Sequence, residues 1–156
     1  MPCIIKDGVL QKYQPYTERK ELETGEGVIA MEVSEVGVKV PEGVTSIGPR
    51  AFAGCESLQY VDLPEGVVDI AAYAFKDCKH LKRVTLPSTV QKVGAYAFAG
   101  CRDLEQIALP AGLEQLGSYA FSYCQSLKQV SGLSTRIISL RGYELFLGCP
   151  LMKRRA

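Results

Sequence analysis

The chain has 156 residues, of which 22% are charged and 47% are hydrophobic, and its formal net charge is +1. Such a near-neutral chain is not expected to bind nucleic acid or a membrane surface, because proteins that do so usually carry a basic excess. No apolar run approaches the roughly 18 residues that span a bilayer, so membrane insertion is not predicted either. The length is that of a single domain.

Residues 1–7 contain neither the basic region nor the long apolar segment of a signal peptide. The sequence as it stands therefore predicts a cytoplasmic protein. If a leading segment has been trimmed from it, a secreted or cell-surface location is the alternative.

Residues 1–40 precede the regular part of the chain. The pair Asp7-Gly8 is a strong turn signal, and the polar residues 14–27 are expected to form a surface loop. Val36, Val38 and Val40 alternate with other residues as a half-buried strand does, but neither Ala-Phe nor Cys comes before them. This segment is predicted to be a half-repeat that caps the first full coil.

Residues 41–131 consist of four 23-residue repeats. A period of this length, held through four copies, predicts stacked structural units with one continuous core. Eight columns are apolar or nearly so, including a Phe column, a Cys column and an Ala column. The Phe and Cys columns are Phe52, Phe75, Phe98, Phe121 and Cys55, Cys78, Cys101, Cys124.

Each repeat has the same predicted anatomy, shown here by the second. The segment 58–63 alternates as a short strand, and Pro64 ends it because proline cannot donate to a ladder. Residues 67–70 predict a second brief strand, and Ala74-Phe75 opens a helical turn that ends at Asp77. Glycine recurs at positions 48, 94 and 117, but Ala71 in the second copy indicates no strict requirement for it.

Residues 132–156 are predicted to be a degenerate closing repeat with a basic tail. Phe146 and Cys149 follow their predecessors by 25 residues rather than 23. Ile137, Leu140 and Met152 still offer a buried set, so this segment is expected to cap the array.

The repeats read Leu-x-x-Val-x-Leu-Pro-x-x-Val-x-x-Ile-Gly-x-x-Ala-Phe-x-x-Cys, which resembles the BspA-like class of bacterial leucine-rich repeats. The stretch from Ile5 to Tyr13 also looks like the hairpin that often precedes such arrays. The resemblance implies an α/β fold: a right-handed leucine-rich-repeat solenoid of short parallel strands and short helical or 3-10 turns, capped at both ends. It also implies a non-enzymatic protein, and many members of the class are surface-exposed or secreted proteins implicated in adhesion.

The six cysteines are expected to be free thiols rather than disulfides. Four of them occupy one inward column, where cysteine acts as a small apolar residue with a weak S–H donor. A linear ladder of this kind cannot direct four ligands onto one zinc ion, so no metal is predicted.

The first candidate site is the outward face of the predicted strands, where leucine-rich arrays generally bind partners. Its side chains are polar and of mixed charge, and they include the residue types enriched at binding hot spots. An ordinary solvated ladder would show the same alternation of charge. The candidate partner-binding residues are Tyr60, Asp62, Lys82, Arg83, Thr85, Glu105, Gln106, Lys128 and Gln129.

The second candidate surface is the column Arg50, Tyr73, Tyr96 and Tyr119. An aromatic row can bind a protein or stack on sugar rings. The alternative is a stacking ladder that only shields each coil.

No catalytic constellation is visible, and the chain is predicted not to be an enzyme. His80, the single histidine, stands two residues from Cys78, but the thiol should point inward and the imidazole outward. No phosphate loop or convergent pair of carboxylates is present, and no cofactor is expected.

The sequence therefore favours a non-catalytic protein-interaction module whose curved sheet face binds an unknown protein partner. One alternative is a secreted or surface adhesin-type fragment that binds carbohydrate. The other is a structural unit that assembles with itself through its ends.

Overall fold

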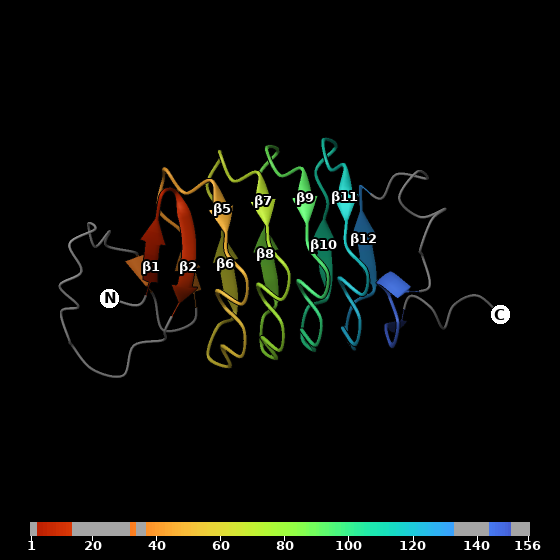
Figure 1. The fold of residues 1–156 in the computed structure, drawn as a ribbon. Helices are drawn as coiled ribbons and strands as arrows, with labels where there is room; N and C mark the ends of the chain where they lie inside the picture. The colour runs from red at the N-terminus through yellow and green to blue at the C-terminus, as the bar shows by residue number, and fades with distance from the viewer. Residues whose placement is uncertain (1–2, 14–31, 34–36, 133–143, 151–156) are drawn as a thin grey trace.

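The computed structural model describes residues 3–13, 32–33, 37–132 and 144–150, and shows a stack of coils running from the N-terminal to the C-terminal end (Figure 1). The predicted surface loop at 14–27 lies outside the described residues, as do Val36, Ile137, Leu140, Met152 and the basic tail. The strands are β1 (Cys3–Lys6), β2 (Val9–Tyr13), β3 (Glu32–Val33), β4 (Gly37–Lys39), β5 (Ser46–Ile47), β6 (Tyr60–Asp62), β7 (Asp69–Ile70), β8 (Arg83–Thr85), β9 (Lys92–Val93), β10 (Gln106–Ala108), β11 (Gln115–Leu116) and β12 (Gln129–Ser131).

The longer strand of each repeat alternates as the sequence predicts. In β6 the Val61 side chain is buried while Tyr60 and Asp62 are exposed, and β8 and β10 show the same pattern. Strands β3, β4, β6 and β8 form one sheet, and β10 pairs with β12 in another. The pairing from β4 onward is parallel, with a register of one repeat per strand.

The shorter strand of each repeat joins β1 and β2 in a second sheet, in the order β1-β2-β5-β7-β9-β11. Ile47 pairs with Ile70, and Ile70 with Val93, so each coil adds one buried apolar residue to this ladder. At the N-terminal end, β1 and β2 form an antiparallel hairpin around Asp7 and Gly8, both of which have positive φ. The hairpin adds the fully buried Leu10 to the core opposite Ile47.

The segment predicted to be a helical turn consists of three hydrogen-bonded turns rather than a continuous helix. In the first coil, Ala51 N donates to Gly48 O at 3.2 Å, Ala53 N to Arg50 O at 3.1 Å and Cys55 N to Phe52 O at 3.2 Å. The intervening amides of Phe52 and Gly54 donate to the next coil, so the chain cannot close successive helical bonds. Among the described residues, only 144–145 and 150 are helical, so the structure is a parallel-strand solenoid with almost no helix.

The core runs through the solenoid as a stack of phenylalanine rings. Phe52, Phe75, Phe98 and Phe121 are fully buried, and Phe146 continues the stack despite its shifted spacing. Successive ring centroids are separated by 4.8, 5.1, 5.4 and 5.8 Å, and the ring planes are nearly parallel.

The cysteine column lies beside the phenylalanine stack, and its five described members are free, buried thiols. The Cys78 thiol donates to Phe52 O at 3.0 Å, and Cys101 donates to Phe75 O at 3.2 Å. Burial raises the pKa of the Cys55 thiol to about 11, and it raises the pKa of Cys78 and Cys101 further. These thiols are neutral donors that join neighbouring coils.

Candidate interaction surface

The strand face consists of the outward side chains of β4, β6, β8, β10 and β12, together with the residue that precedes each of the last four strands. Parallel pairing in register places its residues in rows that run along the solenoid. Tyr60 pairs with Arg83 in one row, and Asp62 pairs with Thr85 in the next. Gln106 pairs with Gln129 further along the first row.

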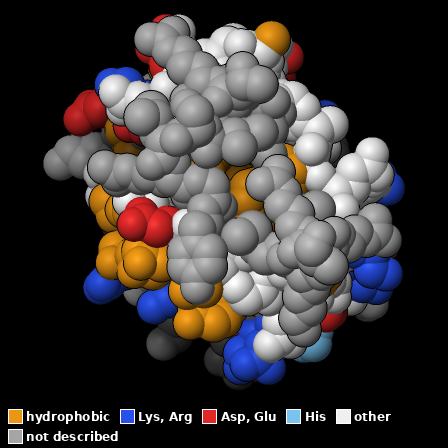
Figure 2. Space-filling model, turned by 90° about the vertical axis from the view of Figure 1, so that its right-hand side faces the viewer, with side chains coloured by type: hydrophobic (Ala, Val, Ile, Leu, Met, Phe, Trp, Pro, Cys, Tyr) orange, Lys and Arg blue, Asp and Glu red, His pale blue; other side chains and the backbone are white. Residues whose placement is uncertain are grey.

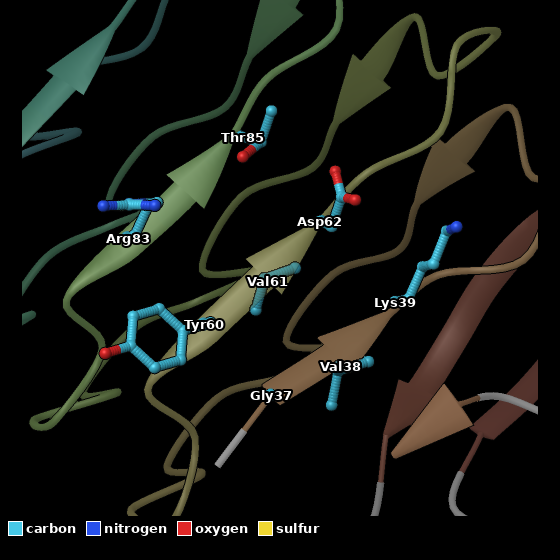
Figure 3. A pocket seen from close by; sticks show the side chains of 8 residues that line it. All are labelled: Gly37, Val38, Lys39, Tyr60, Val61, Asp62, Arg83 and Thr85. Atoms are coloured by element: carbon cyan, nitrogen blue, oxygen red, sulfur yellow. The ribbon is translucent and has the colours of Figure 1, made fainter. Parts of the chain in front are cut away.

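Three shallow hollows lie on this face. The first has a volume of about 400 Å³ and spans β4, β6 and β8 (Figure 3). Tyr60 and Arg83 stand on one side of it, and Lys39, Asp62 and Thr85 stand on the other. Its lining residues are Gly37, Val38, Lys39, Tyr60, Val61, Asp62, Arg83 and Thr85.

The other two hollows adjoin the first and share residues with it. The second, of about 320 Å³, reaches across β10 to Gln129 and Ser131. The third, of about 370 Å³, lies over the loops that follow β4, β6 and β8. Thr85 lines all three hollows, and Arg83 lines the first two, so β8 is at the centre of one continuous groove.

The charged side chains of the strand face have no partners within the described part of the chain. Salt bridges there join Lys79 to Glu56 and His80 to Asp103, and neither pair lies on the strand face. The predicted alternation of Lys82, Glu105 and Lys128 forms no ion pairs among these described residues, although all three are exposed. The other charged residues of the face are Lys39, Asp62 and Arg83.

The sheet beneath the groove is interrupted between β8 and β10. The first sheet ends at β8, and β10 pairs only with β12 among the described strands. The amides of Leu63 and Leu109 donate to the following coil, at 3.3 Å to Thr85 O and 2.9 Å to Ser131 O. The equivalent amide of Leu86 has no such bond within the described residues, and Leu86 is half-buried where it lines two of the hollows.

The second candidate surface is a column of stacked rings. The centroids of Tyr73 and Tyr96 lie 5.2 Å apart, and those of Tyr96 and Tyr119 lie 5.1 Å apart. Arg50 of the preceding coil places its Cζ 5.2 Å from the Tyr73 centroid, and Lys76 Nζ lies 5.5 Å from it. The faces of Tyr73 and Tyr96 are therefore covered by neighbouring groups, as the shielding alternative requires.

The backbone of this column is left-handed. The φ angles of Arg50, Tyr73, Tyr96 and Tyr119 are 58°, 62°, 57° and 60°. Aromatic side chains rarely adopt this conformation, which costs about 1–2 kcal/mol per residue relative to the usual one. The stacking and the hydrogen bonds between coils hold it in place.

The remaining polar groups form no catalytic arrangement in the described residues. His80 Nδ1 lies 3.1 Å from Asp103 Oδ2 of the next coil, whereas the Cys78 thiol is buried against Phe52 O. No group of three or more metal-ligating side chains is assembled within the described residues. No helix in this part of the chain has the length and apolar character to cross a bilayer.

Sequence reasoning missed three charged residues of the groove, which are Lys39, Glu42 and Glu65. Lys39 lies beside Asp62 because Val38 pairs with Val61 and Lys39 with Asp62. The alternation of Val36, Val38 and Val40 carried that register, but the half-repeat lacks the Phe and Cys residues that defined the other rows.

A model of the BspA-type leucine-rich repeat region matches residues 32–153 with six copies, and so covers most of the chain. The chain belongs to the BspA-type leucine-rich repeat family. The matched region extends beyond the four regular repeats at both ends. Among curated proteins, none matches this BspA-type chain.

Solved structures similar to this BspA-type chain include a leucine-rich cell surface protein of Faecalibacterium prausnitzii, with 34% identity over 60% of this chain and 25% of that one, at a TM-score of 0.58. The pneumococcal vaccine antigen PcpA matches with 25% identity over 62% of this chain and 24% of that one, at 0.60. A leucine-rich repeat protein of Bacteroides capillosus matches with 27% identity over 82% and 89%, at 0.60. This chain thus spans about a quarter of the length of the first two.

Proposed function

We propose that this chain is a non-catalytic protein-interaction module that binds a protein partner across its strand face. The observation that carries the proposal is the set of charged side chains that the described residues leave without partners around one groove. A few polar side chains elsewhere in the same repeats pair with the equivalent position of a neighbouring coil, as Lys79 does with Glu56. No such pair forms on the strand face within the described residues, and Arg and Tyr are residue types enriched at hot spots.

The proposed contact residues are those of the groove and its flanks. They are Tyr60, Asp62, Lys82, Arg83, Thr85, Glu105, Gln106, Lys128 and Gln129, to which the structure adds Lys39.

Site-specific photo-crosslinking tests the proposal. A benzoylphenylalanine at Gln106, on the strand face, is expected to capture a protein from the source bacterium. The same group at Gln115, an exposed residue of β11 in the other sheet, is the matched control. Adding Tyr60→Ala and Arg83→Ala to the Gln106 variant should abolish capture. Equal capture from both sheets, or capture that survives the double substitution, would contradict a strand-face interaction.

We also propose that the module acts at the cell surface. The family is bacterial, and a similar solved structure is that of a cell surface protein with 34% identity to this chain. Labelling intact cells of the source bacterium with a membrane-impermeant lysine reagent should modify the protein. Modification only after cell lysis would reject this location and favour the cytoplasmic one.

The structure gives less support to carbohydrate binding at the tyrosine column. A sugar ring stacks on an open aromatic face, but Tyr96 lies between Tyr73 and Tyr119.

Self-assembly through the ends is the other alternative. Hydrophobic and charged side chains are both visible at the C-terminal end of the solenoid (Figure 2).

Residues 1–40 and 132–156 are proposed to act as caps. The hairpin of β1 and β2 adds Leu10 to the core, and Phe146 extends the phenylalanine stack. Deleting residues 1–13 should lower the urea midpoint and promote association, because it exposes the edge of β5. An unchanged midpoint would reject the capping role of the hairpin.

A further inference from the structure

The groove on the strand face has the dimensions of an extended chain. Its two rows of side chains stand two residues apart along each strand, a separation of about 7 Å. A helix with its side chains is about 10–12 Å across, and so is too wide to lie between the rows. The four steps from β4 to β12 cover about 19 Å, which an extended peptide spans with about six residues.

The charges around the groove select the sign of the occupant. The exposed charged residues of the strand face are four basic ones, Lys39, Lys82, Arg83 and Lys128, and two acidic ones, Asp62 and Glu105. The face therefore carries a net charge of +2 (four minus two), compared with +1 for the whole chain. The first two hollows are lined by two basic residues, Lys39 and Arg83, and one acidic residue, Asp62, whereas Glu42 and Glu65 line the third. Complementarity therefore favours an acidic group at Arg83, away from the third hollow.

Donors without acceptors gather at the same place. Arg83 offers a planar guanidinium suited to a carboxylate, and it has no ion pair in the described residues. Thr85 lines all three hollows, and the nearby Leu86 amide lacks the bond that Leu63 and Leu109 make. A guanidinium, a hydroxyl and a free amide together favour a carboxylate ligand.

The two ends of the groove differ. The end at β4, β6 and β8 carries the aromatic ring of Tyr60 and most of the charge. The end at β10 and β12 presents Gln106, Ala108, Gln129 and Ser131, which are small or uncharged. The glutamine amides suit the backbone of a peptide rather than a particular side chain.

We infer that the groove binds an extended peptide segment of a partner protein, with a Glu or Asp carboxylate at Arg83 on β8. The segment continues over Gln106 and Gln129, whose amides bond its main chain. This inference rests on the proposed function and adds the chemistry of the partner.

Fluorescence anisotropy with labelled hexapeptide pools tests the inference. Each pool has Glu, Gln or Lys fixed at one position and is random at the other five. The Glu pools should bind on the order of tenfold more tightly than the Gln pools, and high salt should weaken them. Arg83→Glu should remove this preference and favour the Lys pools.

The matched control is Lys92→Glu, which makes the same change of charge on an exposed strand residue of the other sheet. It should retain the preference for Glu. Urea midpoints of both variants close to that of the parent chain will show that both are folded.

Three outcomes would overturn the inference. The first is equal binding of the Glu and Gln pools, and the second is no binding of any pool. The third is that dextran sulfate binds through Arg83 as tightly as the Glu pools do and displaces them. The last would make an anionic polysaccharide the better ligand. If the Gln106 crosslink still captures a partner, the interaction function stands and only its acidic-peptide chemistry falls. If neither experiment gives a signal, both proposals fall.

Discussion

The strand face and the turn side of this solenoid are built from the same 23-residue repeat, but they use it differently. On the turn side, residues 48–57 of the first coil and their equivalents, several positions pair with their counterparts in the next coil. Tyr73 stacks on Tyr96, Lys79 pairs with Glu56, and His80 lies against Asp103. On the strand face, the charged side chains lie beside one another without pairing in the described residues.

The difference shows how function can be located in a repeat protein. A side chain that recurs and contacts its own counterpart stabilises the stack and needs no external partner. A side chain that varies and is left unpaired at a groove contributes little to stability, so its contribution lies in binding. The following experiments compare the two sides, beginning with the largest expected effect.

Alkaline pH is expected to cause the largest loss of stability, through the thiols beside the turns. The pKa of Cys55 is raised from 9.0 to about 11, and those of Cys78 and Cys101 are raised further. Because the pKa of these thiols is higher in the folded chain than in the unfolded chain, their contribution to the free energy of unfolding is complete below the unfolded pKa of 9.0. That contribution is lost as the pH rises from 9 towards 11. Each such thiol contributes about 1.4 kcal/mol per pH unit in this window. Urea titrations between pH 8 and 11 will measure the slope.

The control for this experiment is Cys55→Ala. It removes one titrating thiol, so its stability should fall less steeply with pH than that of the parent chain. An identical slope would mean that Cys55 is not buried as a neutral thiol.

Phe98→Ala tests the core that the two sides share. Phe98 is fully buried between Phe75 and Phe121, so its truncation should cost about 3–5 kcal/mol in urea titrations. Phe146→Ala should cost less, because Phe146 lies at the end of the described stack, where a coil can fray. Equal losses at the two positions would contradict a stack of separate coils.

Gly94→Ala tests how closely the coils approach on the turn side. A Cβ at Gly94 would clash with Ala72 N, a backbone atom that cannot move aside freely. We expect a loss of about 1–3 kcal/mol by urea titration. At Gly112 the nearest atom to an added Cβ is Ser88 O at 3.7 Å, so Gly112→Ala should be tolerated. Equal stability of the two variants would contradict the close approach of the coils at Gly94.

Tyr96→Gly and Tyr96→Ala separate the stacking of the column from its backbone strain. Both lose the stacking, but glycine adopts a φ of 57° without penalty. The glycine variant should therefore be more stable than the alanine variant by about 1 kcal/mol, the reverse of the usual order. At Tyr60, which is not among the residues with positive φ, alanine should be at least as stable as glycine. The same order at both positions would contradict the left-handed backbone.

The smallest expected effect on stability is that of the pair Tyr60→Ala and Arg83→Ala. Their side chains are exposed and form no bonds within the described residues, so the double variant should lie within about 0.5 kcal/mol of the parent chain. Crosslinking from Gln106 should nevertheless be lost. A large fall in the urea midpoint would show that the strand face is structural.

The sequence predicted the parts of the fold that depend on which residues are apolar. The burial of the Phe column, the strands around Val61 and the register of Val38 follow from that pattern, and the structure confirms them. A continuous helical turn does not form in the first coil, because the amides of Phe52 and Gly54 donate to the next coil rather than along their own turn.

Two other features had no readable signal. Ala71 occupies the position of Gly94 in another coil, so the repeat alone indicates no need for glycine at residue 94. The interruption between β8 and β10 lies between two strands with the same alternation, and nothing in their residues distinguishes it. The candidate rows could be predicted because in-register stacking follows from the period, whereas the lack of pairing among their charges could be seen only in three dimensions.

The backbone bonds between neighbouring turns have a direction. Tyr73 N donates to Ala95 O and Phe98 N to Ala120 O, so at these positions the amide belongs to the earlier coil and the carbonyl to the later one. Gly94 N and Asp103 N donate the opposite way, to Ile70 O and Lys79 O of the preceding coil. Each end of the stack therefore presents its own set of donors and acceptors. Joining two copies through a two-fold axis would place identical sets together, whereas joining them head to tail would continue the ladder. Tandem fusions of this solenoid can therefore be extended in one orientation, with the first coil of each new copy accepting the amides of the last.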